Sequence, residues 1–140
     1  MAPLLKDPTF PYTKMLEMSV LTMGFLSFIA TPGPPSTPWV TNVTRESITV
    51  GWHEPVSNGG SPVTGYHLEM KDRNSILWQK ANKMVIRTTH FKVTTISAGL
   101  IYEFRVYAEN AAGIGKPSHP SDPVLAIDAC GMYLSQEGQF

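Results

Sequence analysis

The stretch from Tyr102 to Asn110 alternates apolar and polar residues over its whole length. Apolar residues at every second position lie on one face of a β-strand, whereas a helix needs them at intervals of three and four. The stretch is therefore predicted to be a half-buried strand. Its inward positions are Tyr102, Phe104, Val106 and Ala108. Its outward positions are Glu103, Arg105, Tyr107 and Glu109.

Similar patterns, interrupted by turn residues, recur along the middle of the chain. They predict strands over residues 47–53, 63–72 and 76–82, and a further strand that includes Phe91 and Val93 and extends toward Ile96. A last strand within 117–127 is predicted to lie at a sheet edge, because its prolines have no N–H group to pair with a neighbouring strand. Turns are predicted at residues 58–62 and 112–115, with Gly113 and Gly115 supplying positive φ angles in the last hairpin. Short strands between turns, without a helical period, indicate an antiparallel sandwich or barrel.

The chain divides into four segments. Residues 1–31 form an N-terminal segment, 32–37 a Pro-rich linker, 38–128 the strand-rich domain and 129–140 a polar tail. The apolar run Met18 to Ala30 is shorter than the roughly 20 residues of a membrane-spanning helix. Its length suits a signal peptide, but Asp7 and Glu17 in the flank and the bulky Phe28 ahead of Ala30 do not. Two interpretations of this run remain open. It is a signal segment, or it is a buried or loosely docked helix or a segment that was never selected for folding.

The composition argues against several classes of function. The 11 basic residues equal the 11 acidic ones, whereas a nucleic-acid-binding protein usually has a basic excess. Cys130 is alone, and the histidines are not spaced as metal ligands. No phosphate loop, catalytic triad or close carboxylate pair is recognisable. We therefore expect no enzymatic activity, metal, cofactor, nucleic acid or small-molecule substrate. The four histidines are His53, His67, His90 and His119.

Residues 39–128 resemble the fibronectin type III family. The matching features are Pro38, Trp52, Tyr66 with Leu68, and the strand 102–110 followed by Ala111-Ala112-Gly113-Ile114-Gly115. The resemblance implies an all-β, seven-stranded antiparallel, immunoglobulin-like β-sandwich. Trp52 would fill the space between the sheets, with one partner for its indole N–H. Tyr102 would form a tyrosine corner, its hydroxyl bonded to the backbone just upstream. The expected core consists of Trp52, Tyr66, Leu68, Ile96, Tyr102, Phe104 and Val106.

Several phrases are similar to the A-band modules of titin (connectin) and related giant muscle proteins. They include Pro32-Gly33-Pro34-Pro35, Trp52-His53-Glu54-Pro55 and Ser121-Asp122-Pro123-Val124-Leu125-Ala126. This resemblance implies a cytoplasmic, sarcomeric module that acts as a spacer and docking element along the thick filament. The implied partners are neighbouring tandem modules and thick-filament proteins such as myosin or myosin-binding protein.

The same resemblance places strands 63–72 and 102–110 side by side, so that their outward residues form one surface. Cross-strand charge pairing alone would explain such a surface. The functional alternative is a protein-binding face anchored by Tyr107 and Arg105, residue types enriched at binding hot spots. The members of this candidate face are His67, Glu69, Lys71, Glu103, Arg105 and Tyr107.

A second hypothesis is an extracellular adhesion or receptor module, secreted or attached to a membrane. Asn42-Val43-Thr44 is a glycosylation sequon, and the apolar run before Thr31 is compatible with export. The hairpin 110–116 contains no Arg-Gly-Asp triplet, and the chain contains no Trp-Ser-x-Trp-Ser motif. The muscle-type phrases favour the sarcomeric hypothesis.

Overall fold

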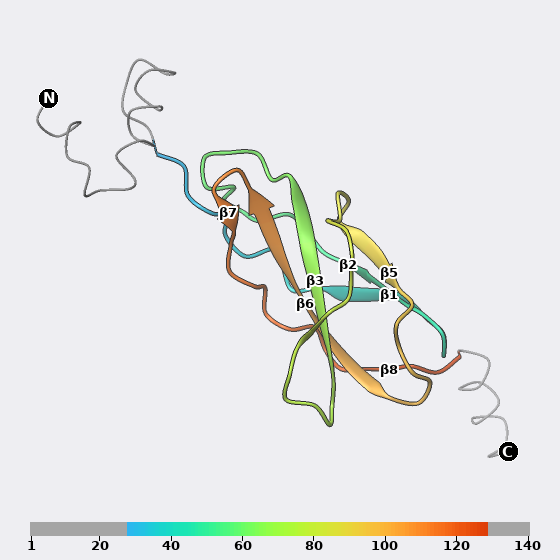
Figure 1. Ribbon diagram of the computed structural model, residues 1–140. Coiled ribbons are helices and arrows are strands. Elements are labelled where there is room, and N and C mark those ends of the chain that lie inside the picture. Colours follow the sequence, from blue (N-terminus) through green and yellow to red (C-terminus); the bar gives the residue numbers. More distant parts are fainter. Residues whose placement is uncertain (1–27, 129–140) are drawn as a thin grey trace, which may run out of the picture.

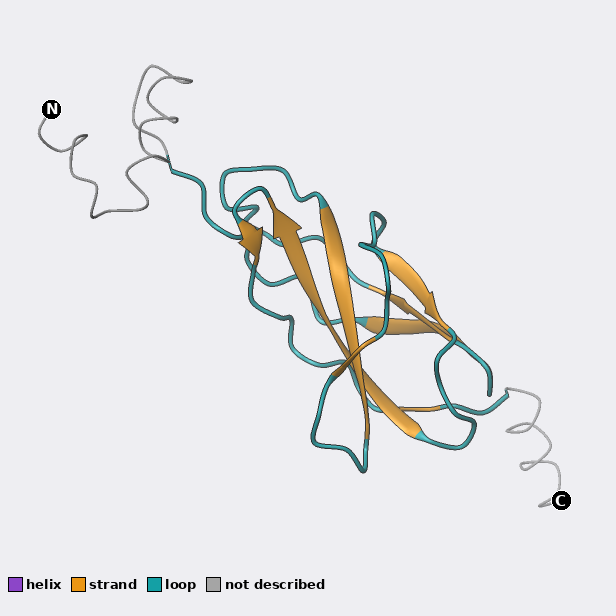
Figure 2. Ribbon diagram, viewed as in Figure 1, coloured by secondary structure: helices purple, strands orange, loops and turns teal. Residues whose placement is uncertain are grey.

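The computed structural model describes residues 28–128 (Figure 1). The apolar run before Phe28, Cys130 and the predicted tail lie outside the described residues. Within 28–128 the chain forms two antiparallel β-sheets and no helix (Figure 2). The predicted all-β fold is therefore confirmed.

The smaller sheet contains β1 (Trp39–Val43), β2 (Ile48–Gly51) and β5 (His90–Val93), in the order β1-β2-β5. The larger sheet contains β4 (Gln79–Lys80), β3 (Gly65–Asp72) and β6 (Ile101–Asn110), and the far side of β6 pairs with β7 (Gly113–Ile114) and β8 (Val124–Leu125). The short β7 and β8 belong to one interrupted last strand, so the sandwich has seven strands. Strand β4 is shorter than the predicted 76–82.

The last strand is interrupted because serine side chains replace part of its backbone pairing. The Ser118 N–H donates to the Val106 carbonyl at 2.8 Å, and the Val106 N–H donates to Ser118 Oγ at 3.0 Å. Ser121 makes the same two bonds with Phe104, at 2.7 and 3.0 Å. The neighbouring Pro117 and Pro120 have no N–H, so this edge offers few donors to another strand.

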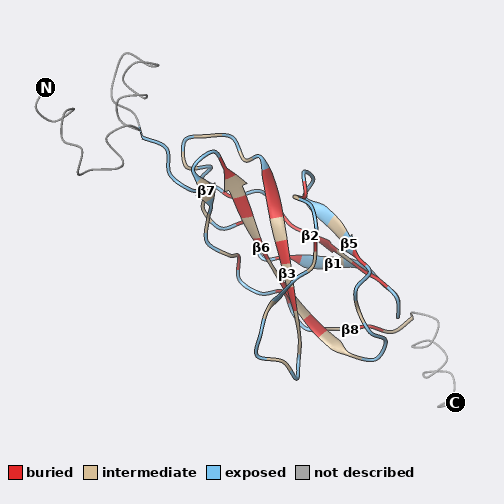
Figure 3. Ribbon diagram, viewed as in Figure 1, coloured by how far each residue is buried: buried red, intermediate tan, exposed pale blue. Residues whose placement is uncertain are grey.

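The core lies between the two sheets, where the inward residues of β2, β3 and β6 are buried (Figure 3). Trp52 is only 1% exposed, and its ring meets the Tyr66 ring edge-on at 5.5 Å between centroids. Its Nε1 is buried without a hydrogen-bond partner among residues 28–128, contrary to the expected N–H bond. The apolar contacts of the indole therefore outweigh the unpaired donor. Leu68, Phe104 and Val106 are fully buried, and Tyr66 and Tyr102 nearly so.

Ile96 differs from the other expected core residues. It is only partly buried and packs against the edge of the core. The reason is its position, because β5 ends at Val93 and Ile96 lies on the connection to β6.

The last hairpin differs from the predicted turn. Residues 111–112 form the turn, and β7 already begins at Gly113. Gly113 has the expected positive φ, 132°, but Gly115 does not. Gly115 is needed for space instead, since a Cβ there would collide with the Pro32 carbonyl oxygen.

The Pro-rich segment predicted to be a linker lies along the domain. Pro32, Pro35 and Pro38 are buried, whereas Thr31, Pro34 and Thr37 are exposed. This period of three is that of a polyproline II helix with one face packed. The Gly33 and Ser36 amides donate to the carbonyls of Ser57 and His53, at 2.9 and 3.1 Å. The proline content predicted a linker here, whereas the burial of every third residue shows that this segment packs on the domain.

We expect Tyr102→Phe to lower the free energy of unfolding by about 1–2 kcal/mol, because it removes one largely buried hydrogen bond. The Ser97 N–H donates to Tyr102 Oη at 2.7 Å, five residues upstream in the chain. Denaturant titration at constant m-value measures the effect. Tyr66→Phe is the matched control, since the Tyr66 hydroxyl makes no hydrogen bond within residues 28–128. Equal stability of Tyr102→Phe and the wild type would contradict the tyrosine-corner role.

Candidate functional site

The outward side chains of β3 and β6 form one continuous surface, which we call the β3–β6 face. The strand register sets Tyr107 opposite His67, Arg105 opposite Glu69, and Glu103 opposite Lys71. All six residues expected from the sequence therefore lie together, as three directly opposed pairs. Unlike the inward residues, they are partly exposed (Figure 3).

The centre of the β3–β6 face is the carboxylate of Glu69. Arg105 Nε donates to Glu69 Oε1 at 2.7 Å, and Tyr107 Oη donates to the same oxygen at 2.9 Å. The side chains of Glu69 and Arg105 are each 25% exposed, so the ion pair is partly shielded from water. A charge-assisted bond in such surroundings holds both partners in one geometry.

Trp78 belongs to this surface although the sequence did not assign it there. The guanidinium carbon of Arg105 lies 4.3 Å from the centroid of the Trp78 ring and 5.6 Å from that of Tyr107. Lys71 Nζ lies 5.8 Å from the Trp78 ring. Trp78 directly precedes β4, and the pairing of β4 with β3 places the indole next to Arg105 and Lys71. The only sequence signal was an aromatic residue in a short neighbouring strand.

Tyr107 remains a hydrogen-bond donor at neutral pH. Partial burial raises the pKa of its phenol, and the hydrogen bond to Glu69 and the negative charge of Glu69 raise it further. The positive charge of Arg105 acts in the opposite direction but does not outweigh these effects. The phenol therefore stays neutral and keeps its proton directed to Glu69.

His67 and Glu109 extend the face toward the end of β6. His67 Nε2 lies 2.7 Å from Glu109 Oε1, and the imidazole is 15% exposed. His67 Nδ1 is buried and has no hydrogen-bond partner within residues 28–128. At the other end, Lys71 Nζ donates to the Ser75 carbonyl at 3.2 Å. Glu69 at the centre and His67 and Lys71 toward the two ends thus each make a polar contact within the domain.

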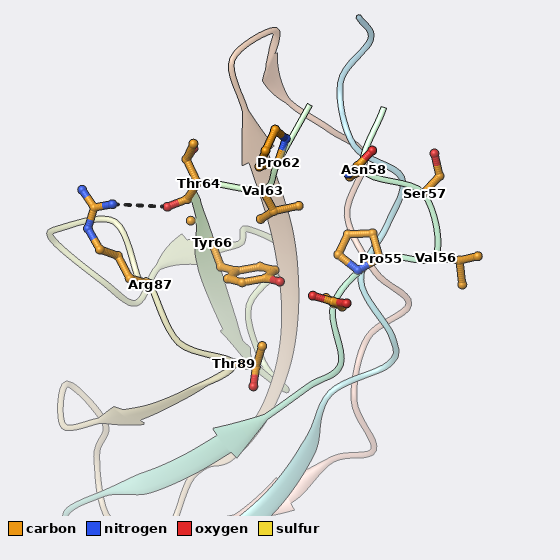
Figure 4. A pocket seen from close by; sticks show the side chains of 12 residues that line it. Pro55, Val56, Ser57, Asn58, Pro62, Val63, Thr64, Tyr66, Arg87 and Thr89 are labelled. Carbon is orange, nitrogen blue, oxygen red and sulfur yellow. Dashed lines mark hydrogen bonds between the residues drawn. The ribbon is translucent and has the colours of Figure 1, made fainter. Parts of the chain in front are cut away.

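A separate hollow of about 750 Å³ lies at the pole of the sandwich nearest Phe28 (Figure 4). It is lined by residues 54–58 and 62–66 together with Arg87 and Thr89. Burial, and secondarily the charge of Glu54, raises the pKa of Tyr66. The hollow is open and polar, unlike the enclosed apolar pockets that hold small molecules.

Two kinds of feature are absent from residues 28–128. No cluster of three or more His, Cys, Asp or Glu side chains is arranged to hold a metal ion. No helix with the length and hydropathy of a membrane span occurs in this part of the chain.

The comparisons with known proteins agree with this fold. Residues 33–124 match the fibronectin type III domain family. The mouse cardiac-type myosin-binding protein C is 39% identical over 103 residues, and the human fast-type protein 37% identical over 103 residues. These matches cover 74% of this chain but only 8% and 9% of the relatives, so the chain spans less than a tenth of their length.

Solved structures give the same relationship. Titin domains A168–A170 superpose with a TM-score of 0.68 and 35% identity, covering 71% of this chain and 34% of that one. Titin module A71 from human cardiac muscle gives a TM-score of 0.65 and 38% identity, covering 70% of this chain and 95% of that one. The matched region is a module related to those of titin and myosin-binding protein C. The chain belongs to the fibronectin type III family.

Proposed function

We propose that this chain is a structural and protein-binding module of a titin-like scaffold in the muscle sarcomere. It acts as a spacer and docking element along the thick filament in the A-band. Its partners are neighbouring tandem modules and thick-filament proteins such as myosin or a myosin-binding protein. The observation that carries the proposal is the β3–β6 face, an ordered and solvent-accessible surface on a module of the titin and myosin-binding protein C type.

The arrangement of the chain ends supports a spacer role. The ends of the described chain lie at opposite poles of the sandwich (Figure 1). At one pole the Ala30 N–H donates to the Gly59 carbonyl at 2.8 Å. At the other, the Arg45 N–H donates to Asp128 Oδ1 at 2.9 Å. Tension along an array therefore passes through the length of the module, and several bonds between β6 and the last strand must break together.

The size of the β3–β6 face supports weak individual binding. One sheet face of so small a domain provides near or below about 1,000 Å² of total interface, the range of transient complexes. Repetition would compensate, since linked modules bind with a raised effective concentration. We therefore propose that affinity arises in the array, while each module contributes orientation.

Calorimetry against purified thick-filament proteins tests this proposal. The single chain is expected to give little heat, while a tandem array of three copies binds at about micromolar strength because of its effective concentration. Arg105→Ala in every copy should weaken array binding, since it removes the central cation. Lys116→Ala is the matched control, because Lys116 is an exposed cation outside the β3–β6 face. Nanomolar binding by one copy, or equal losses in the two variants, would contradict the proposal.

The extracellular alternative has one specific observation in its favour. Asn42 of the sequon is exposed on β1. However, the hydroxyl oxygen of Thr44, the other required residue, accepts hydrogen bonds from the Glu46 and Ser47 amides, at 3.1 and 2.9 Å. A glycosylation-dependent shift in electrophoretic mobility after expression in animal cells would favour this alternative, and its loss in Asn42→Gln would identify the site.

A further inference from the structure

Strand β5 forms an open edge of the smaller sheet. It pairs with β2 on one side and with no strand of the described chain on the other. The Trp52 N–H donates to the Thr89 carbonyl at 2.9 Å, so Thr89, Phe91 and Val93 direct their backbone groups to β2. Because these directions alternate along an antiparallel strand, the N–H and C=O of Lys92 point away from the sheet. His90 also points outward, but its carbonyl already accepts a hydrogen bond from the Thr88 hydroxyl at 2.9 Å, so Lys92 is the one complete pairing position within β5.

An apolar groove runs beside this edge. Its volume is about 370 Å³, and it lies between β5 and the segment 81–86. Phe91 and Ile86 contribute to its lining, and both pack with the core. Met84, another lining residue, is 81% exposed. A strand added to β5 would point every second side chain toward this groove.

The segment around the groove carries charge of one sign only. Although the whole chain has no net charge, residues 73–102 contain no Asp or Glu. Lys83 lines the groove, and Lys92 and Arg87 are exposed nearby in the chain. The basic residues of the segment are Arg73, Lys80, Lys83, Arg87 and Lys92. The edge thus favours an acidic occupant.

We propose that the β5 edge binds an acidic, extended polypeptide segment by strand addition. Backbone groups of the segment pair with those of Lys92, apolar side chains enter the groove, and alternate acidic side chains face the lysines. This site is separate from the β3–β6 face and does not depend on its function.

Charge also decides between possible occupants. A second copy paired antiparallel about Lys92 would place two lysines opposite each other, which is unfavourable. Residues 129–140 contain one acidic side chain, Glu137, and so offer little complementarity. Residues 1–27 carry two acidic and two basic side chains and so offer no net complementarity either, which leaves a separate acidic polypeptide as the occupant.

The test uses the full 140-residue chain labelled with ¹⁵N, and an acetylated, amidated ten-residue peptide of alternating valine and glutamate. Peptide binding should slow hydrogen exchange of the Lys92 amide at least about fivefold, because that N–H becomes paired. The Phe91 amide, already directed to β2, is the internal reference. Peptides with lysine in place of glutamate, or serine in place of valine, should bind at least about tenfold more weakly, a loss of about 1.4 kcal/mol.

Variants locate the site. Lys92→Glu and Met84→Ser should each weaken the valine–glutamate peptide about tenfold. Lys116→Glu, the same charge change beyond β7, should alter affinity by less than about twofold, because the distant charge is screened. If the Lys92→Glu variant fails to fold, Lys92→Gln replaces it in the binding measurement. Unchanged exchange at Lys92 with saturating peptide, equal effects of Lys92→Glu and Lys116→Glu, or equal Lys92 protection by the polyanion heparin would overturn the proposal.

Discussion

Replacing Trp52 with alanine is expected to lower the free energy of unfolding by about 3–5 kcal/mol, the largest single-residue effect that we predict for this domain. The indole is 1% exposed and contacts Tyr66 edge-on between the two sheets. Alanine would leave a cavity that the sheets cannot fill, because both are held by their strand pairing. Guanidinium titration followed by far-ultraviolet circular dichroism measures the loss, since this signal arises mainly from the backbone and not from tryptophan fluorescence.

Trp52→Phe is the matched control. Because Nε1 of Trp52 has no hydrogen-bond partner within residues 28–128, phenylalanine loses volume but no polar interaction. We expect it to retain at least half of the stability that alanine loses. If the two substitutions lower the free energy of unfolding equally, an unrecognised hydrogen bond of the indole N–H, and not cavity formation, would be the main contribution of Trp52 to stability.

Asn110→Ala is expected to cost about 2–4 kcal/mol, because one buried side chain makes three hydrogen bonds. Asn110 is 3% exposed. Its Nδ2 donates to the carbonyls of Ala30 and Asn58, both at 2.7 Å, and its Oδ1 accepts from the Ala112 amide at 2.8 Å. The residue thus joins three segments at one pole. Thermal unfolding of the full chain measures the effect.

Two further variants test how much the hydrogen bonds that Asn110 donates contribute to stability. Asn110→Asp keeps an acceptor for Ala112 but places a carboxylate oxygen against two carbonyls, so we expect a loss at least as large as that of alanine. Asn42→Ala, at an exposed position on β1, should be nearly neutral. A stable Asn110→Asp variant would show that the two donated bonds contribute little.

The alternation within β3 and β6 predicted which of their side chains point outward, while the pairing of the two strands was implied by the family resemblance. A one-residue shift would exchange buried and exposed sets, so the burial of Leu68 and Phe104 excludes such a shift. The observed register brings Glu69 opposite Arg105. The approach of Trp78 to Arg105 was not predictable in this way, because it depends on how the short β4 packs beside β3.

By itself, then, the sequence determined the fold class, the strands that alternate and the inward side chains of β2, β3 and β6, because these depend on patterns local to each strand. Only the tertiary structure decided the remaining features: the packed prolines 32, 35 and 38, the hydroxyl pairing of Ser118 and Ser121, and the free edge at Lys92. Asn110 and Ala30 are 80 residues apart and meet only when the chain has folded. Such contacts leave no local period, since their energy depends on the relative positions of whole segments.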